Sequence, residues 1–151
     1  MKLINQLLDY TQRWTLPAVF LFTGNPVVKQ NGAIVMGRGA AKQVRDFYPG
    51  IDIRFGNGIK EFPNHHLLWV SLHEDQHLGW FKVKNHWQSP AEISLIEESS
   101  RQLGDIATRY PDKTFHMNYP GVGNGRLHID QVRGILTALP DNVLIYGGVP
   151  R

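Results

Sequence analysis

Two glycine-rich turns, each followed by a helix-like run, restrict the fold of this chain more than any other feature. Residues 36–41 read Met-Gly-Arg-Gly-Ala-Ala, and residues 121–127 read Gly-Val-Gly-Asn-Gly-Arg-Leu between a strand-like run at 114–119 and a helix-like run at 128–139. Such a turn presents backbone N–H groups on one concave surface at the positive end of a helix dipole, where phosphate binds. Glycines that only permit a tight turn are the competing interpretation. The presence of two such turns favours a ligand that carries two phosphates.

The rest of the pattern predicts an α/β sandwich. Solid apolar runs are typical of buried strands, and apolar residues at spacings of three and four indicate helices. An antiparallel hairpin within residues 67–83 makes the expected sheet mixed, and ligands of such sheets bind beyond the carboxyl ends of strands. Strands are expected at residues 18–22, 67–72, 78–83, 114–119 and 143–146, and helices are expected to begin near residues 40, 89 and 128.

Three further segments give more local predictions. Residues 3–8 have a weakly helical pattern, and residues 51–63 are expected to be irregular with one short strand or helix. Ser89, Pro90 and Glu92 match the start of a helix, with Ser89 as the N-cap.

Length and composition set further bounds. The 151 residues predict a single domain over residues 1–151, long enough to bury a core. No apolar run approaches the roughly 20 residues that cross a bilayer. The N-terminus does not read as a signal peptide and the chain has no cysteine, so we expect a cytoplasmic protein without membrane span, disulfide or thiolate metal site. The net charge of +3 suits a phosphate ligand but is too small to indicate a duplex-DNA binder.

Several well-known motifs are missing from the sequence. There is no Gly-x-x-x-x-Gly-Lys-Ser/Thr and no Gly-x-Ser-x-Gly, and Arg126 occupies the third glycine position of a dinucleotide-binding fingerprint. The seven histidines match no zinc spacing, so neither a metal nor a cofactor is expected.

Residues 82–90, Lys-Val-Lys-Asn-His-Trp-Gln-Ser-Pro, hold the best candidates for chemistry. In one interpretation the segment is only a strand end and a helix cap with solvated lysines. In the other, a lysine and a histidine stand at the mouth of the site, with Trp87 as a packing or stacking surface. A lysine near other cations in a partly desolvated pocket has a lowered pKa and can attack a sugar carbon. The residues alone do not choose between these interpretations.

Three segments together resemble the macro-domain family. Residues 31–41 resemble a family segment in which an Asn-containing loop leads into Met-Gly-Lys-Gly-Ile-Ala. Residues 83–90 resemble Thr-Lys-x-His-Trp-Arg-x-Pro, and residues 121–127 resemble Gly-Cys-Gly-x-Gly-Gly-Leu. The three follow the family's order over residues 22–146. The branch that they resemble holds the terminal ADP-ribose glycohydrolase of vertebrates and the bacterial antitoxin that removes ADP-ribose from DNA.

The resemblance implies a three-layer α/β/α macro-domain fold with a mixed central sheet and a cleft for ADP-ribose. In this branch a lysine attacks the anomeric carbon of the distal ribose, and Lys84 falls on its position. His86 is then the candidate proton carrier, because histidine titrates nearest neutral pH. Asn31 is the candidate contact for the distal ribose. The ligand-binding residues that follow are Asn25, Asn31, Val35, Met36, Gly37, Arg38, Gly39, Ala40, Gly121, Val122, Gly123, Asn124 and Gly125.

The chain departs from the family pattern at three positions. Protein-directed hydrolases of the branch carry Asp where this chain has Gly125, whereas the DNA-directed relatives also lack that Asp. The adenine-binding Asp of many macro domains has no counterpart near Thr23, so either Asn25 replaces it or stacking alone holds the base. Arg38 stands where relatives often carry Lys, and it still suits an anion.

The expected function is binding of ADP-ribose and hydrolysis of an ADP-ribosyl linkage on DNA or protein. DNA is favoured by the likeness to the DNA-directed relatives and by the basic charge. The alternatives are a non-catalytic ADP-ribose reader, a phosphatase that acts on ADP-ribose 1″-phosphate, and a domain that binds another nucleotide or none. The expected partner is ADP-ribose or an ADP-ribosylated macromolecule, and the sequence leaves open whether a partner toxin exists.

Overall fold

A central mixed sheet organises the protein, whose computed structural model describes residues 1–11, 17–73 and 76–147. Within these residues the strand order is β1-β6-β5-β2-β4-β3, with β3 antiparallel to β4 and every other neighbouring pair parallel. The predicted hairpin and mixed sheet are therefore confirmed, although residues 74 and 75 of its turn lie outside the described residues. The strands are β1 Lys2–Ile4, β2 Ala18–Gly24, β3 Leu67–His73, β4 Gln76–Lys82, β5 Thr114–Asn118 and β6 Val143–Tyr146.

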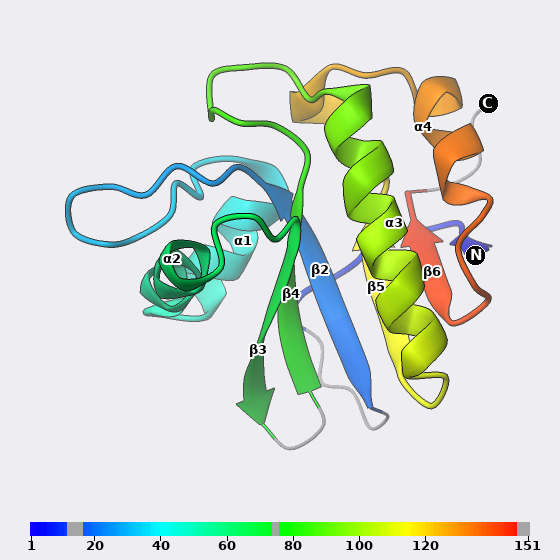
Figure 1. The fold of residues 1–151 in the computed structure, drawn as a ribbon, viewed down its shortest axis with the longest axis horizontal. Helices are drawn as coiled ribbons and strands as arrows, with labels where there is room; N and C mark the ends of the chain where they lie inside the picture. Colours follow the sequence, from blue (N-terminus) through cyan, green and yellow to red (C-terminus); the bar gives the residue numbers. More distant parts are fainter. Residues whose placement is uncertain (12–16, 74–75, 148–151) are drawn as a thin grey trace.

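Helices cover both faces of the sheet (Figure 1). Helices α1 (Gly39–Phe47) and α2 (Ile51–Glu61) pack on one face, and α3 (Ile93–Arg109) and α4 (Ile129–Leu136) pack on the other. The result is a three-layer α/β/α arrangement. None of the helices in the described ranges is both long enough and apolar enough to cross a membrane.

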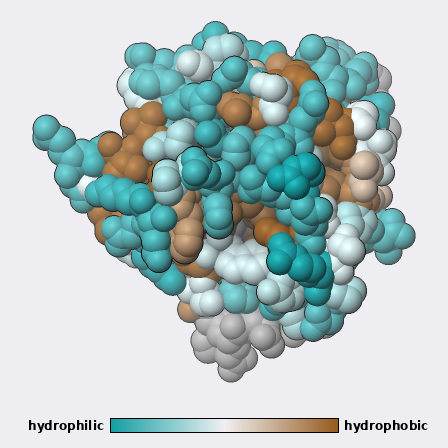
Figure 2. Space-filling view, in the orientation of Figure 1, coloured by the Kyte–Doolittle hydropathy of each residue, from teal (hydrophilic) through white to brown (hydrophobic). Residues whose placement is uncertain are grey.

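Strand β2 shows why its sequence is a continuous apolar run. Val19 and Leu21 belong to the core under α3 and α4, whereas Phe20 and Phe22 belong to the core under α1 and α2. Successive side chains of a strand point to opposite faces, so a strand covered on both sides needs apolar residues at every position. The outer surface is mixed by contrast, and Figure 2 shows apolar residues interspersed with hydrophilic ones.

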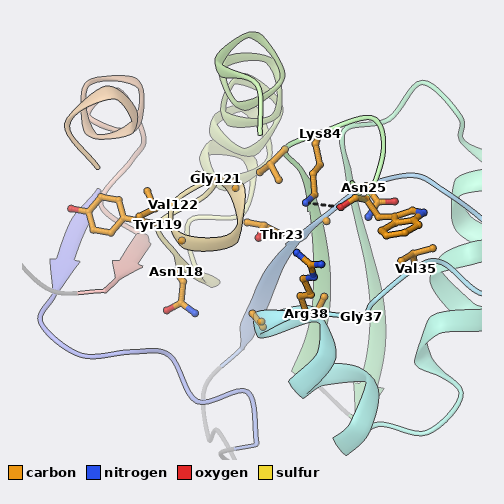
Figure 3. Close-up of a pocket in the computed structure, with 18 of the residues that line it drawn as sticks. Thr23, Asn25, Val35, Gly37, Arg38, Lys84, Asn118, Tyr119, Gly121 and Val122 are labelled. Atoms are coloured by element: carbon orange, nitrogen blue, oxygen red, sulfur yellow. Dashed lines mark hydrogen bonds between the residues drawn. The ribbon is translucent and has the colours of Figure 1, made fainter. Parts of the chain in front are cut away.

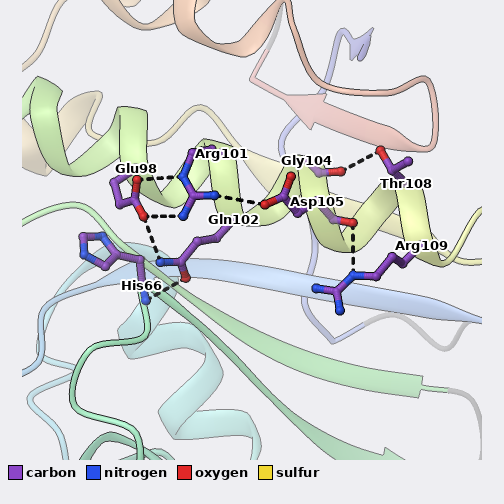
Figure 4. Close-up of polar contacts among 8 residues, drawn as sticks. All are labelled: His66, Glu98, Arg101, Gln102, Gly104, Asp105, Thr108 and Arg109. Carbon is purple, nitrogen blue, oxygen red and sulfur yellow. Dashed lines mark hydrogen bonds and ion pairs between the residues drawn. The ribbon is translucent and has the colours of Figure 1, made fainter.

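Polar contacts fix α3 to the edge of the sheet (Figure 4). The Gln102 side-chain oxygen accepts a hydrogen bond from the His66 N–H at 2.9 Å, and Gln102 also donates to Glu98. The buried Ser99 hydroxyl donates to the Lys82 carbonyl oxygen at 2.6 Å. These contacts hold the end of β4, and hence the residues that follow it, in a defined position against α3.

Three local predictions were wrong. Residues 3–8 are not helical, because residues 2–4 pair with β6 as an edge strand. Most of residues 51–63 form the regular helix α2. Ser89 is not the N-cap of α3, which begins only after Glu92. The Ala91 and Glu92 N–H groups instead donate to the carbonyl oxygens of Gly125 and Val83, each at 2.9 Å.

Candidate functional site

A cleft of about 750 Å³ opens at the carboxyl ends of β2, β4, β5 and β6 (Figure 3). This is the edge at which α/β sheets bind ligands. Both glycine-rich turns border this one cleft. Its lining comprises Leu7, Thr23, Gly24, Asn25, Val27, Lys29, Val35, Gly37, Arg38, Gly39, Ala40, Ala41, Val83, Lys84, Trp87, Asn118, Tyr119, Gly121, Val122, Gly123, Gly125, Ile129, Tyr146 and Gly147.

The first glycine turn ends at the N-terminus of α1. Arg38 is the N-cap residue in an extended conformation, and no side chain caps the helix. The first turn of α1 carries no acidic residue, so its N–H groups and the helix dipole are not offset by a carboxylate of that turn. This end of the cleft therefore suits an anionic ligand group.

The second glycine turn forms the short 3₁₀ segment η1 (Gly123–Gly125). Gly121 and Gly123 both adopt φ of +78°, in the left-handed region that favours glycine. A Cβ at Gly121 would also lie 2.7 Å from the Ile96 side chain, so glycine is required there for packing as well. Arg126, the residue after η1, is the one non-glycine residue with positive φ in the described ranges, at 66°.

Lys84 lies in the cleft between the two turns. Its Nζ donates a hydrogen bond to the Trp87 carbonyl oxygen at 3.2 Å, the dashed line in Figure 3. In the same view, Lys84 and Arg38 extend toward one another from opposite sides. Partial burial lowers the pKa of Lys84, and the positive charges of Arg38 and Arg126 lower it further. An amine with a lowered pKa is a better nucleophile near neutral pH.

Backbone hydrogen bonds hold the Lys84 segment in place. The Val83 N–H donates to the Gly24 carbonyl oxygen at 3.1 Å, at the end of β2. At the other end of the segment, the Ala91 N–H donates to the Gly125 carbonyl oxygen in the second turn. The segment therefore bridges β2 and the second glycine turn, which fixes where the amine can reach.

Most of the predicted site residues come together in this cleft. The first turn contributes its two glycines, Arg38 and Ala40, the second contributes its three glycines and Val122, and Lys84 lies between them. Asn25 and Val35 also line the cleft, and the Asn25 side-chain oxygen accepts a hydrogen bond from the Val27 N–H at 3.0 Å. The side chain of Asn124 lies outside the described part of the structure.

Three predicted residues do not line the cleft. Asn31 is exposed, and its side-chain oxygen accepts a hydrogen bond from the Ala33 N–H, so it shapes its own turn. Met36 is only 2% exposed and packs in the core under α1 and α2. His86 is exposed, and its Nδ1 accepts a hydrogen bond from the Gln88 N–H at 3.2 Å.

Other cleft residues carried no motif in the sequence. Asn118 and Tyr119 follow from the general rule that ligands bind at strand ends, as do Tyr146 and Gly147. Leu7 had no such signal, because its segment was expected to be helical. The next residue, Leu8, is held beside the cleft, because its N–H donates a hydrogen bond to the Asn118 side-chain oxygen at 3.0 Å.

Metal ligands do not gather here: the described residues contain no group of three or more His, Asp or Glu side chains that could hold an ion.

No protein-family model matches the chain, and no curated protein matches it significantly. Solved structures do match. A macrodomain protein from Streptomyces coelicolor is 11% identical, with a TM-score of 0.66 over 91% of this chain and 92% of that chain. The chain has the macrodomain fold.

Within that fold, DarG macrodomains are among the similar structures. The macrodomain of Thermus aquaticus DarG has a TM-score of 0.76 at 20% identity, covering 99% of this chain and 97% of that chain. The macrodomain of Mycobacterium tuberculosis DarG has a TM-score of 0.71 at 23% identity, covering 97% and 98%. Thermosipho africanus DarTG, solved in complex with ADP-ribose, has a TM-score of 0.70 at 23% identity. The match covers 89% of this chain but only 40% of the DarTG chain.

Proposed function

We propose that this chain binds ADP-ribose in the cleft and releases it from a carrier macromolecule by hydrolysis at C1″, the anomeric carbon of the distal ribose. The observation that carries the proposal is the position of Lys84. Its amine lies in the same cleft as the two glycine turns, beside Arg38 and with a pKa lowered by burial and by neighbouring cations.

The two turns support the binding half of the proposal. Their uncapped N–H groups and the N-terminal dipole of α1 would hold the two phosphates. The similar DarTG structure is described as a complex with ADP-ribose. Each turn would take one phosphate, which leaves the distal ribose within reach of the Lys84 segment.

Lys84 would act as the nucleophile. Its neutral Nζ forms a bond to C1″ while the bond from C1″ to the carrier breaks, and the electron pair leaves with the carrier atom. The attacking nitrogen gives one proton to water. A water molecule then adds to C1″ and displaces the amine, which yields free ADP-ribose and regenerates Lys84. Partial burial, and after it the charges of Arg38 and Arg126, lower the pKa of this amine below that of an ordinary lysine, so a larger fraction of it is neutral at a given pH.

The test is release of ADP-ribose from ADP-ribosylated DNA and from ADP-ribosylated protein by the wild type and by Lys84→Ala. We expect Lys84→Ala to lower release by roughly 100-fold or more, the scale of single catalytic groups. Lys82→Ala is the matched control, because Lys82 ends β4 two residues earlier and does not line the cleft. Equal release by the wild type and Lys84→Ala would refute the Lys84 mechanism.

A non-catalytic reader of ADP-ribose is the second candidate. Protein-directed hydrolases of the branch that this chain resembles carry Asp at the position of Gly125. In this chain a Cβ added at Gly125 would lie 2.9 Å from the Ala91 Cβ. This close contact favours a site built without that side chain. Calorimetry that detects ADP-ribose binding, together with no release from either carrier, would support the reader.

The remaining alternatives have their own signatures. Release of inorganic phosphate from ADP-ribose 1″-phosphate would indicate the phosphatase. A bound ligand must stabilise the folded state, by about 2.7 kcal/mol at one hundred times its Kd. No rise in melting temperature with millimolar ADP-ribose would therefore favour a domain that binds another nucleotide or none.

A further inference from the structure

The cleft has two ends, and Lys84 marks only one of them. Figure 3 shows Lys84 and Asn25 on one side of the cleft, and Asn118 and Tyr119 on the opposite side. In the proposed function C1″ lies at Lys84 and the diphosphate lies at the two glycine turns. The purine base is joined to the other side of the diphosphate through the proximal ribose. The base therefore falls at the Asn118 end, away from Asn25.

Leu7 gives this end of the cleft an apolar surface that is still in contact with water. Its side chain lines the cleft and is 76% exposed. The backbone is held on both sides of it, because the Gln6 carbonyl oxygen accepts a hydrogen bond from the Gly147 N–H at 2.9 Å and the Leu8 N–H donates to the Asn118 side chain. A flat base that covers Leu7 would remove apolar surface from water, which favours binding.

The side-chain amide of Asn118 has a fixed orientation. Its Oδ1 accepts the hydrogen bond from the Leu8 N–H at 3.0 Å, so the other atom of the amide is the Nδ2 donor. No group among the described residues accepts a hydrogen bond from this Nδ2. A free amide N–H₂ can donate to N7 of a purine, and N7 is an acceptor in adenine and in 6-oxo purines alike.

Hydrogen-bond acceptors are what this end of the cleft lacks. The described residues that line the cleft include no aspartate and no glutamate. The Tyr146 hydroxyl lies 2.7 Å from His116 Nδ1, and the Tyr119 hydroxyl is buried. The Tyr146 carbonyl oxygen already accepts a hydrogen bond from the Tyr119 N–H at 3.1 Å. The exocyclic amine of adenine is a donor, so these groups offer it no acceptor.

We propose that the cleft recognises the base by its apolar face and by one ring acceptor, and that it does not read the exocyclic amine of adenine. IDP-ribose, in which the 6-oxo purine hypoxanthine replaces adenine, is then a ligand of the same site. The proposal rests on the proposed function, because that function places the base opposite Lys84. A site that hydrogen-bonds a particular substrate group rejects analogues without it strongly, whereas a site that lacks this partner discriminates weakly.

The test is calorimetry with three ligands: ADP-ribose, IDP-ribose, and a base-free analogue in which a methoxy group replaces adenine on the proximal ribose. The proteins are the wild type, Leu7→Ala and Leu3→Ala. Leu3→Ala is the matched control, because Leu3 is also an exposed leucine of the N-terminal segment, at 41%, but does not line the cleft.

We expect the wild type to bind IDP-ribose no more than about tenfold more weakly than ADP-ribose. Leu7→Ala should weaken the binding of both by the same factor, roughly 3- to 10-fold, the scale of partly burying one leucine side chain. It should leave the base-free analogue unchanged, and Leu3→Ala should leave all three ligands unchanged.

A larger preference of the wild type for ADP-ribose would overturn the proposal, because it would require an acceptor for the exocyclic amine. An equal effect of Leu7→Ala on the base-free analogue would overturn it as well, since Leu7 would then not contact the base. Failure of the wild type to bind any of the three ligands would instead refute the proposed function.

Discussion

Lys84 owes its chemical interest to the residues that surround it. A lone surface lysine keeps its proton at neutral pH, but this one is partly buried, and the positive charges of two arginines from other segments, Arg38 and Arg126, act on it. Both effects disfavour its charged form. Neither is visible in the local sequence, because Arg38 and Arg126 lie far from residue 84 along the chain. The sequence indicated which lysine to consider, and the fold supplies the reason that it could react.

The pH dependence of hydrolysis follows from these charges. If the neutral amine is the nucleophile, kcat/KM should rise with pH along one ionisation whose midpoint lies below 10.5, the ordinary pKa of lysine. Arg38→Gln removes a like charge, so the pKa of Lys84 and the midpoint should both move to higher pH. Initial rates between pH 6 and 10 measure the shift. A midpoint that is unchanged, or that moves to lower pH, would contradict this account of the amine.

At the level of elements, local pattern predicted the strands well and the irregular segments poorly. The buried strands carry their own signal, because apolar residues occupy both faces of β2 and β6. In α2, Gly56 and Gly58 read as helix breakers. Gly56 is needed because a Cβ there would lie 1.8 Å from the Gly32 carbonyl oxygen. That requirement depends on packing against a distant loop, which no local pattern reveals.

In the site too, some residues could be predicted from local sequence and others depend on distant parts of the chain. The glycine turns and Lys84 could be predicted, because turn geometry and the ordered motifs are local properties of the sequence. Asn31 and His86 were assigned to the site by motif, but each side chain accepts a backbone hydrogen bond within its own turn. Leu7 could not be predicted, since its place at the cleft follows from the pairing of β1 with β6 and from the hydrogen bond that its neighbour Leu8 donates to Asn118.

The second glycine turn offers a matched pair of substitutions. Gly121 and Gly123 share a φ of +78°, but a Cβ would crowd the Ile96 side chain at Gly121 and meet nothing within 4 Å at Gly123. Gly123→Ala should lower the free energy of unfolding by about 1 kcal/mol, which is the cost of holding an alanine in the left-handed backbone region. Gly121→Ala should lower the free energy of unfolding by roughly 1–3 kcal/mol more, because its Cβ also overpacks the core. Urea unfolding measures both changes. Equal losses would mean that the turn relaxes and that packing does not require Gly121.

Across the whole molecule, the sheet brings separate segments to one edge. The carboxyl ends of β2, β4, β5 and β6 meet at the cleft, and helices on both faces hold them there. The stability of this sheet should limit the pH range in which the cleft exists. A buried histidine, His116 on β5, is the group to which we assign this dependence of stability on pH. Its two ring nitrogens lie 2.7 Å from the Tyr146 hydroxyl and 2.8 Å from the Thr114 hydroxyl.

Burial lowers the pKa of His116 to about 4, from an ordinary value of 6.5. Between these values the unfolded chain binds a proton that the folded chain does not, so stability is lost as the pH falls from 6.5 to about 4. The shift corresponds to about 3 kcal/mol. The free energy of unfolding, measured in urea across this range, should fall by about that amount more in the wild type than in His116→Gln. Parallel curves for the two proteins would show that His116 does not carry the effect.

A crystal structure of the wild-type protein soaked with ADP-ribose tests the central claim most directly. The account predicts that the diphosphate oxygens lie within hydrogen-bond distance of N–H groups from both glycine turns, and that C1″ faces Lys84 Nζ. Density for the ligand at another surface, or a distal ribose turned away from Lys84, would contradict it.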